Sequence, residues 1–107
     1  PTLREADGLA MSSRNVYLSP EERASAPLLH HVLRAAASAI EAGEDAEAVL
    51  AQGRERMSQG GFALDYLEWR DATSLGLAQR DKASRLLVAA RLGKTRLIDN
   101  VSVAAGV

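Results

Sequence analysis

The residues best suited to chemistry in this sequence form one short polar run, Met11-Ser12-Ser13-Arg14-Asn15. Two adjacent hydroxyls, a guanidinium and the backbone N–H groups of a turn can all donate hydrogen bonds to phosphate oxygens. The run therefore predicts a phosphate-contacting loop. A purely structural role is also open, in which the two serines cap a short turn and the arginine pairs with Asp7 or Glu5.

Other candidate groups have simpler structural explanations. Gly93-Lys94-Thr95 matches the end of a P-loop, but Val88 stands where that signature needs its first glycine, and a strand-like run follows where it needs a helix. His30 and His31 are adjacent on a predicted helix and point about 100° apart, so they cannot clasp one metal ion as an i, i+4 pair would. The acidic residues have capping or solvent-facing explanations, and no metal site is predicted.

Caps and hydrophobic periods predict the elements that must position the polar run. Residues 1–18 show neither a helical nor a strand period, and we expect an ordered loop there. Ser19-Pro20-Glu21-Glu22 combines an N-cap serine, a proline at the first helical position and a glutamate at N3. A helix is therefore expected to begin at this point and to run to Glu41. Pro27 lies inside it, where it removes one backbone hydrogen bond and would kink the second turn.

Asp45 is predicted to cap a second helix that ends at Gly60-Gly61, so that residues 19–59 form a helical pair. Within 62–103 three runs favour strands, and Gly93-Lys94 suits a type II′ turn between the last two. The strand-like runs cover 62–69, 86–92 and 95–103. The predicted fold is α+β: a helical hairpin packed on a small three-stranded antiparallel sheet, preceded by the ordered loop.

Composition excludes several classes of function. The 107 residues carry a net charge of -1, which gives no strong field for nucleic acid or an anionic membrane, and no apolar run is long enough to span a membrane. The absence of cysteine excludes thiolate chemistry, and a cytoplasmic location is expected. Charge is nevertheless uneven: residues 1–69 hold six basic and eleven acidic side chains, whereas residues 70–107 hold seven and three. Solvated faces explain this more simply than a docking surface does.

The longest motif begins at the first residue and carries a resemblance to a known family. The run from Pro1 to Ser19, PTLREADGLAMSSRNVYLS, resembles the segment that opens the C-terminal domain of the pantoate-β-alanine ligase family. Two later runs resemble the closing strands of that family in the same order; they are DYLEWRD at 65–71 and LLVAARLG at 86–93 with TRLIDN at 95–100. Because a motif-dense segment follows Pro1 directly, without Met or a structural lead-in, we expect a single domain, 1–107, that is a piece of a longer chain.

The resemblance implies an ATP-dependent enzyme. Members of the family use ATP and Mg²⁺ to join pantoate to β-alanine through a pantoyl-adenylate, with release of pyrophosphate. Their C-terminal domain acts as a lid on an N-terminal Rossmann-like domain, and the MSSRN segment contacts ATP. In this chain the ATP-contacting positions fall on Leu3, Met11, Ser12, Ser13 and Arg14, with Arg14 as the stabiliser of transition-state phosphate charge. Leu3 stands where many members have Val, a change that a backbone contact to adenine tolerates. No Mg²⁺ ligand falls in this domain, and the isolated domain is expected to be inactive.

Two other functions remain open from the sequence. The chain could be a non-catalytic interaction module that docks on a partner through its charge asymmetry, or a free-standing ATP-binding domain. The second is less favourable, because four or five contacts on a loop must overcome the cost of ordering that loop. An exposed sheet edge could also pair two copies of the chain in a homodimer.

Overall fold

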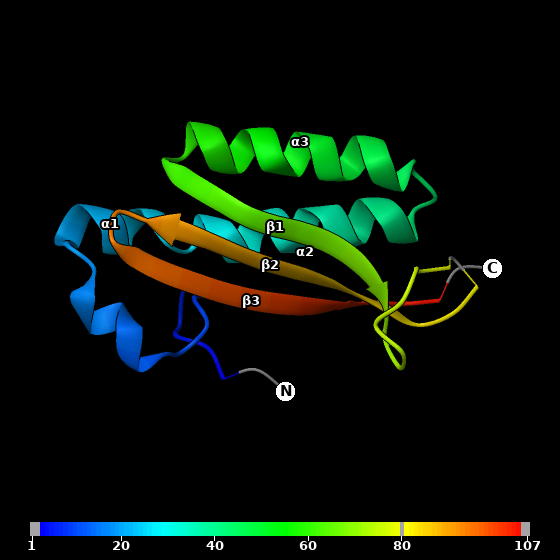
Figure 1. Cartoon of the computed structure of the whole chain (residues 1–107), viewed down its shortest axis with the longest axis horizontal. Helices are drawn as coiled ribbons and strands as arrows, with labels where there is room; N and C mark the ends of the chain where they lie inside the picture. The colour runs from blue at the N-terminus through cyan, green and yellow to red at the C-terminus, as the bar shows by residue number, and fades with distance from the viewer. Residues whose placement is uncertain (1–2, 80, 106–107) are drawn as a thin grey trace.

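The computed structural model describes residues 3–79 and 81–105, so the first two residues of the predicted loop lie outside the described part. The elements follow in the order η1 (Ser13–Tyr17), α1 (Pro20–Ser25), α2 (Leu28–Glu41), α3 (Ala46–Gln59), β1 (Phe62–Asp71), β2 (Ser84–Leu92) and β3 (Thr95–Val103). Helices α2 and α3 lie side by side against one face of the three-stranded antiparallel sheet (Figure 1). The predicted α+β fold is confirmed.

Both predicted helix starts are present. At the start of α1 the Ser19 hydroxyl accepts from the Glu22 N–H at 3.1 Å, and the Glu22 carboxylate accepts from the Ser19 N–H at 2.9 Å, which completes a capping box. At the start of α3 the Asp45 carboxylate accepts from the Ala48 N–H at 3.1 Å. These side chains satisfy backbone donors that have no partner inside the helix.

The single long helix expected over 19–41 is wrong. Helix α1 ends at Ser25 and α2 begins at Leu28, although both intervening residues keep helical backbone angles. Pro27 causes the division, because it has no N–H to donate to the preceding turn and its ring crowds the carbonyl four residues earlier. The break leaves α1 as a short separate element between the N-terminal loop and α2 (Figure 1).

The sheet has the order β1-β2-β3, with each strand antiparallel to its sequence neighbour. The β2–β3 turn has a positive φ of +62° at Gly93 and none at Lys94, as a type II′ turn requires. In β1 the register shifts between Leu64 and Tyr66, which leaves Asp65 as an extra residue in a β-bulge. The bulge reverses which side chains of β1 face the helices.

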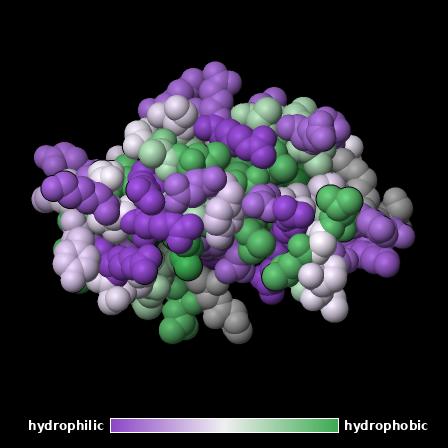
Figure 2. Space-filling view, viewed as in Figure 1, coloured by the Kyte–Doolittle hydropathy of each residue, from purple (hydrophilic) through white to green (hydrophobic). Residues whose placement is uncertain are grey.

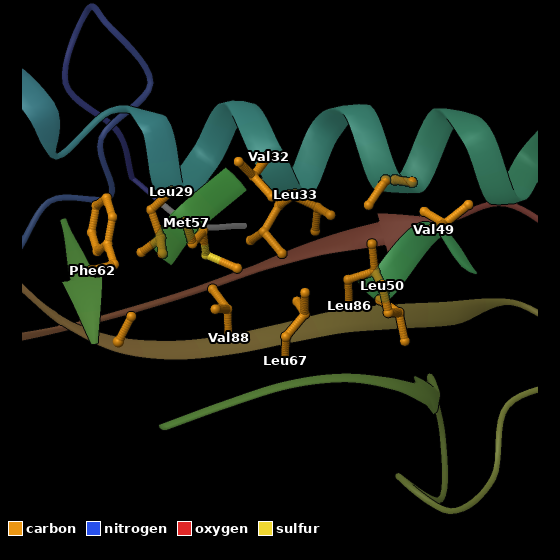
Figure 3. Packing of buried hydrophobic residues seen from close by; sticks show 14 of the residues in the cluster. Leu29, Val32, Leu33, Val49, Leu50, Met57, Phe62, Leu67, Leu86 and Val88 are labelled. Atoms are coloured by element: carbon orange, nitrogen blue, oxygen red, sulfur yellow. The ribbon is translucent and has the colours of Figure 1, made fainter. Parts of the chain in front are cut away.

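The core lies between the two long helices and the sheet. Figure 3 shows side chains from α2 and α3 meeting those of the strands in one apolar layer. The largest fully buried side chains are Leu29, Val32, Leu33, Met57, Leu67, Leu86 and Val88. The N-terminal loop contributes the buried Leu9 to the same cluster, and the partly buried Leu18 packs against it. No helix in the described part of the chain is long and apolar enough to cross a membrane.

Candidate functional site

The N-terminal segment closes on itself before it reaches the polar run. The Glu5 N–H donates to the Leu9 carbonyl at 2.8 Å, and the Met11 N–H donates to the Leu3 carbonyl at 2.8 Å. A turn at Gly8, whose φ is +95°, joins the two sides. Leu3 and Met11, eight positions apart in sequence, are therefore direct backbone partners, and both side chains are exposed.

The polar run supplies the N-cap, Ser12, and the first three residues of the short 3-10 helix η1. The Ser12 hydroxyl oxygen accepts from the Arg14 N–H at 3.1 Å and so caps η1, which agrees with the structural role open for Ser12. That bond uses a lone pair of the oxygen, and the Ser12 O–H remains a donor. The Asn15 side-chain amide donates to the Ala10 carbonyl at 3.1 Å and fastens η1 to the segment before it.

Arg14 does not make the ion pair that a structural role would require. Asp7 instead pairs with Arg23 at 2.8 Å, and this pairing lowers the pKa of the Asp7 carboxyl. Within residues 3–79 and 81–105 the Arg14 guanidinium has no hydrogen bond or ion pair, and its side chain is exposed. It is therefore free to bind an anion.

A second group of cations lies beside Arg14 at the β2–β3 turn. An open hollow of about 1030 Å³ is lined by Arg14, Arg91, Lys94 and Arg96 together with Tyr17, Gly93 and Thr95, and no Asp or Glu is among these residues. Figure 2 shows hydrophilic side chains gathered over the end of the molecule where Figure 1 places this turn. The hollow is a cationic surface continuous with the polar run.

Asp65 partly neutralises this surface from outside the hollow. Its carboxylate accepts a hydrogen bond from the Arg96 guanidinium at 2.8 Å and lies 3.8 Å from the Arg91 guanidinium. The hydrogen bond from Arg96 is the main cause of a lowered pKa of Asp65, with the positive charge of Arg91 adding to it. An oxygen of the Glu22 carboxylate also lies against Gly93. Two carboxylates thus face the four cations that line the hollow, which keeps an excess of positive charge.

A second, smaller hollow of about 590 Å³ separates the loop from the sheet. Met11, Ser12 and Arg14 line it on the loop side, and Tyr66 and Ile98 line it on the sheet side. Its walls combine exposed apolar surface with hydrogen-bond donors, which suits a ligand that has a flat apolar part and a charged part.

The structure thus brings together all five residues singled out for ATP contact. Leu3 pairs with Met11, and Ser12, Ser13 and Arg14 follow directly in η1 and its cap. Sequence reasoning missed the cations of the β2–β3 turn as a part of the site. Their signal in the sequence is the excess of basic residues after position 70, which a solvated face also explains.

The donors of this site do not suit a divalent metal. Mg²⁺ prefers carboxylate and water oxygens, whereas the loop offers hydroxyls, amides and cationic side chains. No group of three or more His, Cys, Asp or Glu residues that could hold a metal ion occurs in the described part of the chain. We therefore assign no metal-dependent step to these residues.

Fold and site together define a small α+β domain whose surface displays hydroxyl, guanidinium and ammonium groups, which are donors suited to an anion. The sequence profile described as pantoate-beta-alanine ligase matches residues 1–102, nearly the whole length. The chain belongs to the pantoate-β-alanine ligase family, a family of enzymes, and corresponds to its C-terminal domain.

Two curated relatives are similar over almost the entire chain. The pantothenate synthetase of Acidiphilium cryptum is 60% identical over 104 residues, and that of Rhodopseudomonas palustris strain HaA2 is 57% identical over 105 residues. Each alignment covers 96% of this chain and 37% of the relative. The chain therefore spans little more than a third of the length of these relatives.

Solved structures agree with this assignment. A pantothenate synthetase from Thermus thermophilus superposes with a TM-score of 0.84 and 41% identity, over 96% of this chain and 38% of that one. The pantoate-beta-alanine ligase from Francisella tularensis, solved in complex with beta-gamma ATP and beta-alanine, gives a TM-score of 0.64 and 27% identity over 94% of this chain and 31% of that one. Relatives of this chain thus include one seen with an ATP-type ligand.

Proposed function

We propose that this chain is the lid domain of an ATP-dependent ligase that condenses pantoate with β-alanine. Its partner is an N-terminal Rossmann-like domain of the same cytoplasmic enzyme. The observation that carries the proposal is the exposed Arg14 guanidinium, which has no partner among the described residues and directly follows Ser12 and Ser13 on a loop that is itself tightly bonded. Family membership and the ATP-type ligand of the Francisella relative support ATP as the ligand.

In the proposed reaction the loop acts on the phosphate chain of ATP. The pantoate carboxylate attacks the α-phosphorus, the bond from that phosphorus to the bridging oxygen breaks, and pyrophosphate leaves with the electron pair. Negative charge on the leaving group grows as this bond breaks. Donors from Ser12, Ser13 and Arg14 stabilise that charge more in the transition state than in bound ATP, which accelerates the step. The amine of β-alanine then attacks the acyl carbon of the pantoyl-adenylate, and AMP leaves.

The remaining predicted contacts position the nucleoside. Met11 lines the 590 Å³ hollow next to the start of η1, and Leu3 is its backbone hydrogen-bond partner. In the proposed complex the backbone at Leu3 meets the adenine and Met11 covers it. Closure of the domain over ATP would exclude water from the adenylate, which water would otherwise hydrolyse. Because the chain lacks a site for pantoate in this proposal, it has no ligase activity alone.

A chimeric enzyme tests the proposal. Residues 1–102 of this chain replace the matching segment of the Acidiphilium cryptum relative, and pyrophosphate release is measured with ATP, pantoate and β-alanine. The chimera is expected to turn over, and Arg14→Ala is expected to lower its kcat by about 10²-fold or more, the usual effect of removing one donor to a developing charge. Arg56→Ala, an exposed arginine on α3, serves as the matched control and should leave the rate unchanged.

One outcome would contradict the proposal, and a separate titration distinguishes ATP binding by the domain alone. An Arg14→Ala chimera that keeps its rate within about threefold would show that Arg14 does not act on the reacting phosphates. Such a result would favour the alternative function, a non-catalytic module that docks on a partner chain. Saturable amide shifts at Leu3 and Met11–Asn15 on titration of the 107-residue chain with Mg-ATP would instead support a domain that binds ATP without its partner.

A further inference from the structure

Arg4 joins the N-terminal loop to the last strand of the sheet. Its guanidinium donates to the Gly8 carbonyl at 3.0 Å on the loop side. On the sheet side it donates to both oxygens of Asp99, at 2.7 and 2.8 Å, and to the Asn100 carbonyl at 3.1 Å. One side chain thus makes four hydrogen bonds that tie together two segments 95 residues apart in sequence.

The pair is buried where it meets β3. The side chain of Asp99 is 1% exposed and that of Arg4 is 22% exposed. Asp99 faces the helices, and its Oδ1 also accepts from the Asn100 N–H at 2.7 Å. The bond to Asp99 raises the pKa of Arg4, so the guanidinium stays charged. Because the planar Arg4 guanidinium bonds both oxygens of the Asp99 carboxylate, the guanidinium has little freedom to shift or rotate relative to β3.

Arg4 also stands next to the predicted ATP contacts. It follows Leu3 directly, and it pairs across an antiparallel bridge with Ala10, which precedes Met11. The Met11 N–H in turn donates to the Leu3 carbonyl. The position of Leu3 and Met11 relative to the sheet therefore depends on where Asp99 holds Arg4.

The other ion pair of this loop has a different character. Asp7 and Arg23 meet at 2.8 Å between the tip of the loop and α1, where the Asp7 side chain is 45% exposed and that of Arg23 is 35% exposed. Exposed pairs of this kind contribute little to stability. The Asp7–Arg23 pair is therefore a natural control for the Arg4–Asp99 pair, because both start from the same loop.

We propose that Arg4 and Asp99 are positioning residues for nucleotide binding, which hold Leu3 and Met11 at the distance from β3 that the nucleoside requires. This inference rests on the proposed function. Neither residue touches the nucleotide; both act through the backbone of the loop. Arg4 and Asp99 thereby extend the functional set from the loop to a residue in the last strand.

Hydrogen exchange in the 107-residue chain tests whether Arg4 fixes the backbone of the N-terminal loop. Arg4→Lys keeps a cation against Asp99, so no buried charge is left alone, but a single ammonium cannot reproduce the four directed bonds. The amides of Glu5 and Met11 are expected to exchange at least about fivefold faster in Arg4→Lys, while amides of α2 keep their rates. Arg23→Lys is the matched control and should leave Glu5 and Met11 unchanged. Unchanged protection of Met11 in Arg4→Lys, at unchanged α2 protection, would overturn the inference.

Steady-state kinetics of the chimera tests the functional part. Arg4→Lys is expected to lower kcat/KM for ATP by about tenfold or more, with a thermal midpoint close to that of the parent. Arg23→Lys should change neither. An Arg4→Lys chimera with parental ATP kinetics would overturn the positioning role while the proposed function stood on the Arg14→Ala result. If Arg14→Ala were itself fully active, the proposed function would fail, and with it the assignment of Arg4 and Asp99 to nucleotide binding.

Discussion

The helix-sheet layer and the N-terminal loop are held together by different forces. In the layer, side chains of α2, α3 and the three strands bury one apolar cluster, and hydrophobic burial fixes their positions (Figure 3). In the loop, η1 has no buried residue and Leu9 is the residue that enters the core. The loop is fixed instead by backbone bonds, by the Ser12 cap and by the bonds of Arg4.

The difference shows how a small domain can keep a polar surface both ordered and available. Burial would hide the side chains that are proposed to meet a ligand, whereas bonds made by the backbone and by Arg4 leave Ser12, Ser13 and Arg14 facing outward. Stability and the proposed ligand contact therefore depend on separate residues. Substitutions in the two regions should separate in their effects, and four predictions test this contrast from the largest effect to the smallest.

The layer should respond most strongly. Leu33 is fully buried between α2 and the sheet, so Leu33→Ala removes apolar contacts and leaves a cavity. The expected loss in the free energy of unfolding is about 2–5 kcal/mol, measured by urea denaturation. Ser38→Ala, at an exposed position of the same helix, should change it by less than about 0.5 kcal/mol. A loss below about 1 kcal/mol for Leu33→Ala would mean that burial does not dominate the layer.

Gly8 tests the fit between the loop and α2. An added Cβ at Gly8 would lie 2.5 Å from Cδ2 of His30, whereas at Gly43, which has the same φ of +95°, it would meet nothing within 4 Å. Gly43→Ala thus measures backbone strain alone, about 1–2 kcal/mol. Gly8→Ala should cost about 1–3 kcal/mol more, because the clash adds to the strain. If Gly8→Ala and Gly43→Ala lost the same free energy of unfolding in thermal or urea denaturation, the loop would be moving away from His30 at no cost.

His30 should make stability depend on pH. Desolvation is the main cause of its lowered pKa, the charges of Arg4, Arg34 and His31 lower it further, and Asp99 opposes them. Since the folded pKa lies below the ordinary value near 6.5, the unfolded chain takes up the proton first. Stability is therefore full above about pH 6.5 and declines as pH falls toward the folded pKa.

The pH effect is measured by urea unfolding between about pH 7.5 and 5. His30→Gln should flatten this part of the profile. The exposed neighbour His31 provides the control: its charge is the smallest of the causes that act on His30, so His31→Gln should keep most of the slope. If His30→Gln kept the full slope of unfolding free energy against pH, groups other than His30 would be the cause of the slope.

Arg14 should have the smallest effect on stability. Its side chain is exposed, and its own N–H rather than its guanidinium takes part in the Ser12 cap. Arg14→Ala is expected to change the free energy of unfolding by less than about 0.5 kcal/mol in urea. A loss above about 1 kcal/mol would reveal a structural role and would blur the contrast between the loop and the layer.

Local features were well predicted from the sequence because they depend on near neighbours. Ser19 and Asp45 cap helices through bonds to residues three positions away, and the Gly93-Lys94 turn follows from one φ preference. Pro27 was recognised as a disturbance, but the division of the helix was not predicted. Whether the loss of one hydrogen bond at Pro27 divides the helix depends on how α1 and α2 pack. No local pattern in the sequence shows that packing.

Features that join distant segments could not be predicted in the same way. The aromatic-rich run after Phe62 breaks the alternation of a strand at Asp65, and the bulge that explains this break depends on the register with β2. Asp99 stands in an ordinary alternating strand, at a position that faces the helices, and its partner Arg4 lies in the loop. A buried charge in such a strand is the signal that could have pointed to a distant cation.

The link between Arg4 and Asp99 also sets an order of events during synthesis. Ribosomes make the chain from its N-terminus, so the loop emerges long before β3. Helices α2 and α3 can begin to form from local contacts, but the loop cannot reach its final position until Asp99 has been translated and β3 has paired with β2. The residues proposed to meet ATP are thus made before the rest of the domain and are set in place after it.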